Sequence, residues 1–429
     1  MSEIENLSLR GEPGGRNSEL AAQAGLSGSG VPRFENALNP DPAARIERVR
    51  QALVELREGR IVILVDDEDR ENEGDLCMAA EKVSPEAINF MARYGRGLIC
   101  LTLTEERADY LQLPLQATRA GGPSLGTAFT VTIEARHGVT TGISAADRAH
   151  TILTAVGPQS RPEDLITPGH IFPLRAKRGG TLVRTGQTEG SVDLSRLAGL
   201  APAGVICEIM NDDGTMARLP DLQRFAETHD LLVLSVADII EYRLQTERLV
   251  ECVREFPIVP TVDGQPLRGF HAQLFRTLVE PTEYLALYKG DLGHDEPALV
   301  RVQTANFPGD VLAAVGCDSG AQLRAALKTI DEAGRGVLLY IFPTQRYTLK
   351  SDLDAHLPPA ARPGASAEPP PPPIDKLRDF GLGAQVLRTL GVQRMRLMTD
   401  NPRKIAGLQG YGLTIAELLP LHVRPGCAS

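Results

Sequence analysis

An acidic run, VDDEDRENEGD, covers Val65–Asp75 and is the segment whose residue types suggest chemistry most directly. Between Asp66 and Asp75 it holds seven acids, one arginine, one asparagine and one glycine. Acids this close together repel one another, and most such runs are solvated loops. Carboxylate oxygens are also the donors that Mg²⁺ prefers in proteins. The run therefore leaves two interpretations open, a solvated loop or a site for a divalent cation and its ligand.

Four further segments carry groups suited to acid–base chemistry or to anion binding. They are GVTTGISAADR (138–148), TPGHIFPLRA (167–176), LVRTGQTEGSVDL (182–194) and CEIMNDDGTMA (207–217). Each segment alone has a simpler structural explanation. His170 would be a hydrogen-bonded loop histidine, and Glu208 would be a paired core acid, because an unpaired buried charge is costly. The order of all these segments along one chain is what favours a common site.

The elements that must position these groups follow from the apolar pattern. Ile61–Val65 is a run of aliphatic residues typical of a buried strand, so the acidic run begins at the carboxyl end of a strand, where open α/β sheets often bind ligands. Apolar residues at helical spacing predict a helix from Ile46 to Gly59. Helix and strand patterns then alternate up to residues 235–256, which we expect to form a helix joining two domains. The whole pattern predicts an α/β fold.

The composition of the chain limits its class. At 429 residues it is long enough for two or three domains. Its hydrophobic share of 42% and charged share of 23% are ordinary for a globular protein, and its net charge of -10 argues against nucleic-acid or anionic-membrane partners. No run approaches the ~20 apolar residues of a membrane helix, and no signal-peptide core is present. Six scattered cysteines without a CxxC pair indicate a reduced, cytoplasmic protein.

Composition shifts predict the domain boundaries. Residues 1–43 are rich in Gly, Ser, Asn, Ala and Pro and lack periodicity, so we expect a disordered tail. We expect a first α/β domain over residues 44–245 and a second over residues 258–422. A proline-rich insertion, residues 357–374, interrupts the second domain, because Pro369–Pro373 exclude both helix and central strand.

The first half carries four specific strings, DDEDRENEGD, GVTTG-SAADR, PGH-FPLRA and NDDGTMAR, within residues 46–243. In this order they closely resemble 3,4-dihydroxy-2-butanone 4-phosphate synthase of riboflavin biosynthesis. The resemblance implies conversion of ribulose 5-phosphate to a four-carbon ketone phosphate plus formate, with Mg²⁺ or Mn²⁺ as the cofactor. That reaction removes a proton beside a carbonyl, so it needs acid–base groups and a cation for the charge that develops.

The resemblance also implies the role of each matching side chain. The implied metal ligand is Glu71, the substrate-binding residues are Arg70, Asp75, Arg184 and Thr188, and the catalytic residues are His170 and Glu208. One position departs from the family, whose RxGHTE string holds a metal-binding histidine. Here the string is RTGQTE, with Gln187 at that place. A glutamine carbonyl is a hard oxygen donor that suits Mg²⁺ but does not titrate near neutral pH, so we expect Gln187 to bind the metal without moving protons.

The second half resembles GTP cyclohydrolase II, through GLGAQVLRTLGV (381–392) and RLMTDNPRKIAGLQGYG (396–412). That family holds its catalytic zinc on three cysteines spaced C-x₁₀-C-x-C, and the three places here are Asn306, Cys317 and Ser319. A catalytic zinc needs about three protein ligands, which one thiolate cannot supply. We therefore expect no zinc and a degenerate, inactive second domain.

The leading prediction is a cytoplasmic synthase that acts on a small sugar phosphate. The family is homodimeric, so the resemblance implies a homodimer, without nucleic-acid or membrane partners. Two alternatives stay open. One is a bifunctional enzyme that also has GTP cyclohydrolase II activity, which the lost zinc ligands oppose. The other is a non-catalytic scaffold or regulator of the pathway, which Gln187 and Asn306 favour.

Overall fold

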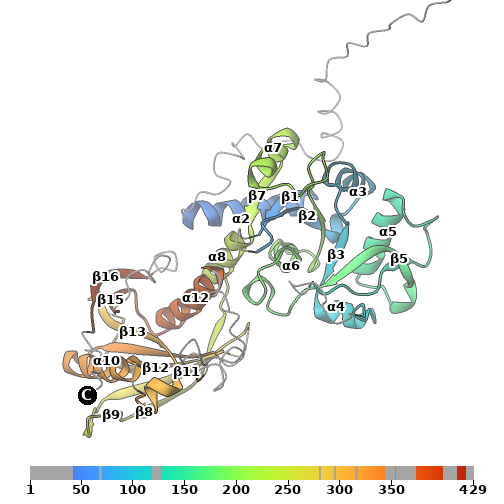
Figure 1. Cartoon of the computed structure of the whole chain (residues 1–429). Coiled ribbons are helices and arrows are strands. Elements are labelled where there is room, and N and C mark those ends of the chain that lie inside the picture. Colours follow the sequence, from blue (N-terminus) through green and yellow to red (C-terminus); the bar gives the residue numbers. More distant parts are fainter. Residues whose placement is uncertain are drawn as a thin grey trace, which may run out of the picture. The chain divides into compact units, whose positions relative to one another are not determined.

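Two compact units, residues 1–239 and 240–429, make up the computed structural model of the chain (Figure 1). The structure describes residues 42–66, 70–117, 127–279, 282–293, 296–314, 317–343, 353, 373–399 and 413–421. The expected tail, residues 1–43, and the expected proline-rich insertion, residues 357–374, lie almost wholly outside these ranges, so both stay predictions. Within the described ranges, no helix is long and apolar enough to cross a membrane.

The first unit is built on a mixed seven-stranded sheet with the strand order β4-β5-β3-β6-β2-β1-β7. Its strands are β1 (Val62–Val65), β2 (Gly74–Ala79), β3 (Cys100–Leu103), β4 (Ile133–Ala135), β5 (Leu165–Arg175), β6 (Ala203–Glu208) and β7 (Leu232–Ser235). β1 runs parallel to β7 and β3 runs parallel to β5, whereas the other neighbours are antiparallel. The predicted strand before the acidic run is confirmed as β1, which is buried along its whole length.

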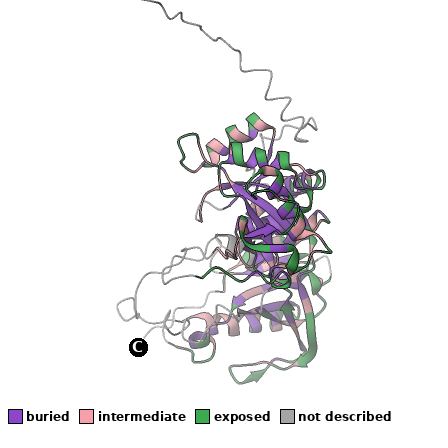
Figure 2. Ribbon diagram, turned by 90° about the vertical axis from the view of Figure 1, so that its right-hand side faces the viewer, coloured by how far each residue is buried: buried purple, intermediate pink, exposed green. Residues whose placement is uncertain are grey.

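Helices cover both faces of this sheet. They are α2 (Pro42–Arg57), α3 (Pro85–Phe90), α4 (Glu105–Tyr110), α5 (Ala145–Val156), α6 (Gln187–Leu197) and α7 (Leu219–His229), with short turns η1 (Ala80–Lys82), η2 (Met91–Gly95), η3 (Pro162–Asp164) and η4 (Gly180–Leu182). Ile63, Leu76 and Val205 belong to the core that α3, α5 and α7 complete. Leu64 points to the opposite face, where a Cβ at Gly190 of α6 would lie 2.7 Å from Leu64 Cδ2. The strands between these layers are mostly buried, purple in Figure 2.

The second unit contains a separate seven-stranded sheet with the order β16-β15-β13-β14-β12-β11-β8. Its strands are β8 (Val250–Ile258), β11 (Phe270–Thr277), β12 (Thr282–Lys289), β13 (Ala298–Thr304), β14 (Gly336–Pro343), β15 (Arg394–Met398) and β16 (Thr414–Leu419), and β9 (Thr261–Val262) and β10 (Gln265–Pro266) form a small hairpin. The helices are α9 (Phe307–Asp310), α10 (Ser319–Ala333) and α12 (Pro373–Thr389). Leu327 and Ile330 of α10 pack against Leu338 of β14 in the core. The two-domain α/β prediction is confirmed.

The helix predicted over residues 235–256 is wrong in its second half. Helix α8 (Val236–Thr246) ends within the predicted range, and β8 then begins at Val250. β8 pairs with β11 from Val250 to Ile258, so its backbone hydrogen bonds are made in a sheet. Tertiary pairing of this kind overrides local propensity, and a single apolar pattern cannot reveal it.

Candidate active site

The acidic run turns the chain from β1 into β2, and its first acid points inward. Asp66 directly follows β1 and is buried. Its Oδ1 accepts a hydrogen bond from the amide of Glu73 at 2.9 Å, and its Oδ2 accepts one from the amide of Glu71 at 3.1 Å. Residues 67–69 lie outside the described part of the chain. The described part of the run therefore fits a structured site better than a solvated loop.

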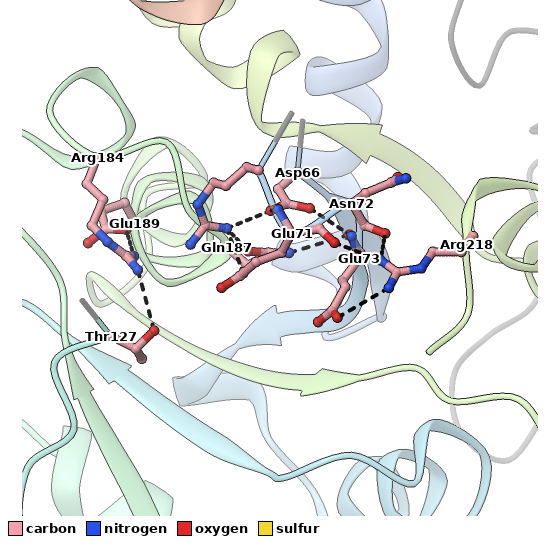
Figure 3. Close-up of polar contacts among 10 residues, drawn as sticks. Asp66, Glu71, Asn72, Glu73, Thr127, Arg184, Gln187, Glu189 and Arg218 are labelled. Carbon is pink, nitrogen blue, oxygen red and sulfur yellow. Dashed lines mark hydrogen bonds and ion pairs between the residues drawn. The ribbon is translucent and has the colours of Figure 1, made fainter. Parts of the chain in front are cut away.

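Three side-chain oxygens converge on the guanidinium of Arg70 (Figure 3). Its Nη1 donates to Asp66 Oδ2 at 2.6 Å, to Glu71 Oε2 at 2.7 Å and to Gln187 Oε1 at 2.9 Å. Gln187 comes from the first turn of α6, so the group joins two distant segments of the chain. The charge of Arg70 offsets the repulsion between the neighbouring carboxylates. We refer to Asp66, Arg70, Glu71 and Gln187 as the hairpin cluster.

The donor atoms of the hairpin cluster fit a hard divalent cation. Two carboxylates and one amide carbonyl are oxygen donors, and Mg²⁺ is usually held by one or two carboxylates while it keeps several waters. A cation bound by all three oxygens would have to displace Arg70 Nη1, because this nitrogen lies where they meet. Among the described residues, no group of three His, Cys, Asp or Glu side chains could hold a metal ion. The hairpin cluster has only two acids, and its third oxygen donor is the amide of Gln187.

Arg218 fastens the same turn from the other side, and the sequence analysis did not single it out. Its Nη1 donates to the carbonyl oxygens of Glu71, at 2.7 Å, and of Asn72. Its Nη2 lies 3.9 Å from Glu73 Oε1 (Figure 3). Burial and the charge of Glu71 raise the pKa of Glu73, and Arg218 acts in the opposite direction. Arg218 belongs to the string NDDGTMAR, so the signal was present in the sequence.

Asp75 and Glu208 are directly paired on the neighbouring strands β2 and β6. Asp75 is also paired with Leu64, which packs against Gly190 of α6, and directly paired residues point to the same face. Both acids therefore face the α6 side. Glu208 is half-buried, and its Oε2 accepts a hydrogen bond from the amide of Leu98 at 2.8 Å. Burial raises the pKa of Asp75 well above its usual value, and the charge of Glu208 raises it further.

The N-terminus of α6 brings Arg184 near Arg70. Gly186 is the N-cap of this helix and offers no side chain to its first amides. A Cβ at Gly186 would lie 2.5 Å from Arg184 Nη1 and 3.2 Å from Arg70 Nη2, so glycine is what allows both guanidinium groups to approach. Thr188 lies buried in the same first turn. Two guanidinium groups beside a helix N-terminus suit a phosphate.

Arg184 is itself held by a buried acid that the sequence analysis also missed. Arg184 Nη1 donates to Glu189 Oε2 at 2.7 Å (Figure 3). The amide of Lys177 donates to Glu189 Oε1 at 3.0 Å. Burial raises the pKa of Glu189, whereas Arg184 and these hydrogen bonds oppose the rise. The acid stands in the string RTGQTE, two residues after Gln187, so the signal was present in the sequence.

His170 lies on β5 with partners outside the hairpin cluster. Its Nδ1 is 2.6 Å from Oε2 of Glu134, a buried acid on β4. No hydrogen bond or ion pair of His170 within the described residues reaches Arg70, Glu71 or Gln187. The structure therefore joins Arg70, Glu71 and Gln187 by hydrogen bonds, whereas His170 is joined to Glu134.

The three expected zinc positions of the second half do meet in space. Asn306 caps α9, because its Oδ1 accepts the amide of Gly309 at 2.8 Å, and Ser319 Oγ lies 3.4 Å from the same Oδ1. A Cβ at Gly309 would lie 3.0 Å from Cys317 Cβ. The donors at this place are an amide oxygen, a hydroxyl and one thiol. The spacing of the motif thus preserves the location, while the donor atoms differ from three thiolates.

Two family models match the chain, one for each half. The model of 3,4-dihydroxy-2-butanone 4-phosphate synthase matches residues 50–242, and that of GTP cyclohydrolase II matches residues 260–420. The chain is 49% identical over 386 residues to the riboflavin biosynthesis protein RibBA of Aquifex aeolicus, which covers 89% of this chain and 94% of that protein. The chain belongs to the RibBA family of fused riboflavin-biosynthesis proteins.

Other members and relatives of the RibBA family are similar over most of the chain. The bifunctional riboflavin biosynthesis protein RIBA 1, chloroplastic, of Arabidopsis thaliana is 45% identical over 385 residues, 89% of this chain and 70% of that protein. The crystal structure of RibBX, a two-domain 3,4-dihydroxy-2-butanone 4-phosphate synthase from A. baumannii, is 38% identical with a TM-score of 0.68. It covers 86% of this chain and 99% of its own.

The predicted inactivity of the second half is wrong by this comparison. That prediction rested on Asn306 and Ser319 in place of zinc-binding cysteines, and on residues 342–344 and Lys376 at two further places of the family pattern. The GTP cyclohydrolase II model matches residues 260–420, and relatives 45% to 49% identical over most of the chain are named RibBA or bifunctional. These findings favour the bifunctional alternative over a synthase with an inactive second domain.

Proposed function

We propose that the first half of the chain, residues 44–245, converts ribulose 5-phosphate to 3,4-dihydroxy-2-butanone 4-phosphate plus formate in riboflavin biosynthesis. The observation that carries the proposal is the convergence of Asp66, Glu71 and Gln187 on Arg70, beside the N-terminus of α6. A cation position next to an anion position is what a phosphorylated ketose requires. Membership of the RibBA family supports the same reaction.

Glu71 and Gln187 would hold the divalent ion, Mg²⁺ or Mn²⁺. The bound ion would supply positive charge to the sugar oxygens while the carbon beside the carbonyl loses its proton. The orientation of Gln187 supports its role as an oxygen ligand: Oε1 faces the hairpin cluster, whereas Nε2 turns to the carbonyl of Glu73 at 3.4 Å. Arg184, Thr188 and backbone amides at the start of α6 would bind the phosphate.

The acid–base work would fall to His170 and Glu208. Several protons move during a skeletal rearrangement, so groups of different acidity are needed at one site. Asp75, which is paired with Glu208 and faces the α6 side, would bind a sugar hydroxyl together with Arg70. Glu208 is half-buried on the next strand and would exchange protons with the substrate.

Formate release tests this proposal. The full chain is incubated with ribulose 5-phosphate and either Mg²⁺ or Mn²⁺, and formate is measured with a coupled dehydrogenase. We expect release that EDTA stops and that excess Mg²⁺ restores. A folded protein that releases no formate with either ion would refute the synthase reaction and return the scaffold alternative.

A second activity is supported by separate observations, the cyclohydrolase model over residues 260–420 and the relative named bifunctional. We infer that the second half, residues 258–422, acts on GTP. Its metal chemistry would differ from a three-thiolate zinc site, because Asn306 and Ser319 offer oxygen and only Cys317 offers sulfur. The absence of stoichiometric zinc therefore stays a prediction. Formate release from GTP with Zn²⁺, Mg²⁺ or Mn²⁺, alongside metal analysis, tests both points, and no release with any ion would refute the second activity.

The location, oligomeric state and partners of the protein are also proposed from the family resemblance. We expect a cytoplasmic homodimer with a small sugar phosphate as its substrate and without nucleic-acid or membrane partners. Light scattering of the purified chain tests the assembly, and a monomer of 46.3 kDa at micromolar concentration would contradict it.

A further inference from the structure

A buried carboxylate holds His170 in place. Glu134 stands on the short strand β4, and its side chain is only 8% exposed. Its Oε2 lies 2.6 Å from His170 Nδ1 and accepts the backbone amide of His170 at 3.2 Å. Its Oε1 accepts a hydrogen bond from Thr151 Oγ1 at 3.0 Å. Both carboxylate oxygens are therefore engaged, and one ring nitrogen of His170 is fixed.

This contact selects one tautomer of the imidazole. An ionised carboxylate can only accept hydrogen bonds, so the ring nitrogen that faces it must carry the hydrogen. In a neutral imidazole the lone pair then lies on the other nitrogen, Nε2. The His170 side chain is 44% exposed, and Nε2 has no hydrogen bond within the described residues. The free nitrogen is thus the one able to take a proton from a ligand.

The segment GVTTGISAADR closes over the Glu134–His170 contact. A Cβ at Gly142 would lie 2.0 Å from Glu134 Oε2 and 2.5 Å from His170 Nδ1, and Gly142 has a φ of +91°, so glycine is required there twice over. Asp147 holds this loop, because its carboxylate accepts the amides of Gly142 at 3.0 Å and of Thr140 at 3.1 Å. A hydrogen bond from the Thr140 hydroxyl at 2.7 Å, together with these amides, lowers the pKa of Asp147 to about 2, so the anchor stays ionised. The segment GVTTGISAADR, which contributes no residue to the hairpin cluster, therefore serves to enclose the Glu134–His170 contact.

We propose that Glu134 is the positioning residue for His170. Glu134 keeps His170 in the Nδ1–H tautomer, so that Nε2 takes the proton from a carbon beside the substrate carbonyl. The C–H bond breaks, an Nε2–H bond forms, and the electron pair moves onto the carbonyl oxygen. The carboxylate of Glu134 then faces an imidazolium and stabilises its charge. The proton transfer in this inference rests on the proposed synthase reaction. The tautomer of His170 does not, because it follows from the contact with Glu134 alone.

Nitrogen NMR of the full chain labelled with ¹⁵N-histidine tests the tautomer directly. The resonances of His170 are assigned by their loss in His170→Asn. We expect Nδ1–H in the neutral ring of the native chain, and a shift of at least half the population to Nε2–H in Glu134→Ala, which lacks the acceptor. Nε2–H in the native chain, or the same tautomer in a folded Glu134→Ala, would overturn the proposal.

Steady-state kinetics of Glu134→Gln supply the second readout. The amide keeps an oxygen acceptor but lacks the charge, so kcat for formate release should fall ~10- to 100-fold while KM changes less than ~3-fold. Glu106→Gln, which removes an exposed glutamate from α4, is the matched control and should leave both unchanged. An unchanged kcat in Glu134→Gln would overturn the proposal. If no variant, including the native chain, releases formate, the synthase reaction fails, and the NMR experiment still decides the role of Glu134.

Discussion

The two halves of the chain gather their candidate metal positions in different ways. In the hairpin cluster, two carboxylates and the carbonyl of Gln187 surround a single guanidinium, so negative charge is concentrated there and only partly offset by Arg70. In the second half, Asn306, Cys317 and Ser319 meet beside α9. The side-chain oxygen of Asn306 accepts the hydrogen bond that caps this helix. Both places preserve the spacing of a family motif. The comparison shows that the spacing of the motif residues along the chain keeps their side chains together in space. Their donor atoms decide which ion can bind there.

Loss of a carboxylate from the hairpin cluster should have the largest effect. In Glu71→Gln, the rate of formate release from ribulose 5-phosphate should fall at least ~100-fold. The substitution removes a charged ligand from the divalent ion that stabilises the negative charge developing on the substrate. The measurement is kcat at saturating Mg²⁺, with Glu106→Gln as the control for a neutralised exposed acid. A near-normal kcat would remove Glu71 from the site.

Restoring sulfur to the second half should have the next largest effect. In the double variant Asn306→Cys, Ser319→Cys, three thiols would meet where one does now, and zinc prefers thiolate ligands. We expect zinc to bind at least ~10-fold more tightly than in the native chain, measured by competition with a chromogenic chelator. The single variant Ser319→Cys is the control and should gain less. Equal affinities in all three proteins would mean that these positions do not form one site.

A histidine in the hairpin cluster should change the metal preference rather than abolish activity. Gln187→His replaces a hard oxygen with an imidazole nitrogen, which favours Mn²⁺ over Mg²⁺. The ratio of the half-saturating Mg²⁺ and Mn²⁺ concentrations should shift ~3- to 10-fold toward Mn²⁺ in assays of formate release. Coincident curves for variant and native chain would show that position 187 does not touch the ion. A large gain from near zero would show instead that Gln187 disables the native site.

The raised pKa of Asp75 predicts a smaller effect on stability. An acid whose pKa is higher in the folded than in the unfolded state contributes stability that is fully present below its unfolded pKa, ~3.9, and is lost as pH rises through its folded pKa. The native chain should therefore lose free energy of unfolding relative to Asp75→Asn as pH rises from ~4 toward neutrality. Urea unfolding in EDTA at several pH values measures this difference, and a difference that does not vary with pH would contradict the shift.

The local pattern of the chain was enough for part of the fold. Ile61–Val65 forms a buried strand because a run of aliphatic residues suits a sheet covered on both faces, and the predicted first helix is present, although it begins earlier, at Pro42. The second half of the range 235–256 could not be assigned in this way. Its apolar residues are compatible with a helix or a strand, and pairing with β11 decides between them.

The candidate site was predictable where its residues stand in recognisable sequence strings, and less so where a residue stands outside them. Arg70, Glu71 and Gln187 were expected as a set, and they share hydrogen bonds. Glu134 was not expected, because a lone acid between two apolar residues on a short strand gives no sign that it faces His170, 36 positions away. Contacts of that range depend on strand pairing and loop closure, which only the folded structure shows.

Binding of Mn²⁺ to the full chain, followed by electron paramagnetic resonance of the free ion, tests the central claim most directly. The hairpin cluster should bind one Mn²⁺ per chain, and Mg²⁺ should displace it. Affinity should fall at least ~10-fold in Glu71→Gln, because a carboxylate ligand becomes a neutral amide, and should be unaffected in the control Glu106→Gln. Mn²⁺ binding of equal affinity in the native chain and in Glu71→Gln would contradict the assignment of the acidic run as a cation site.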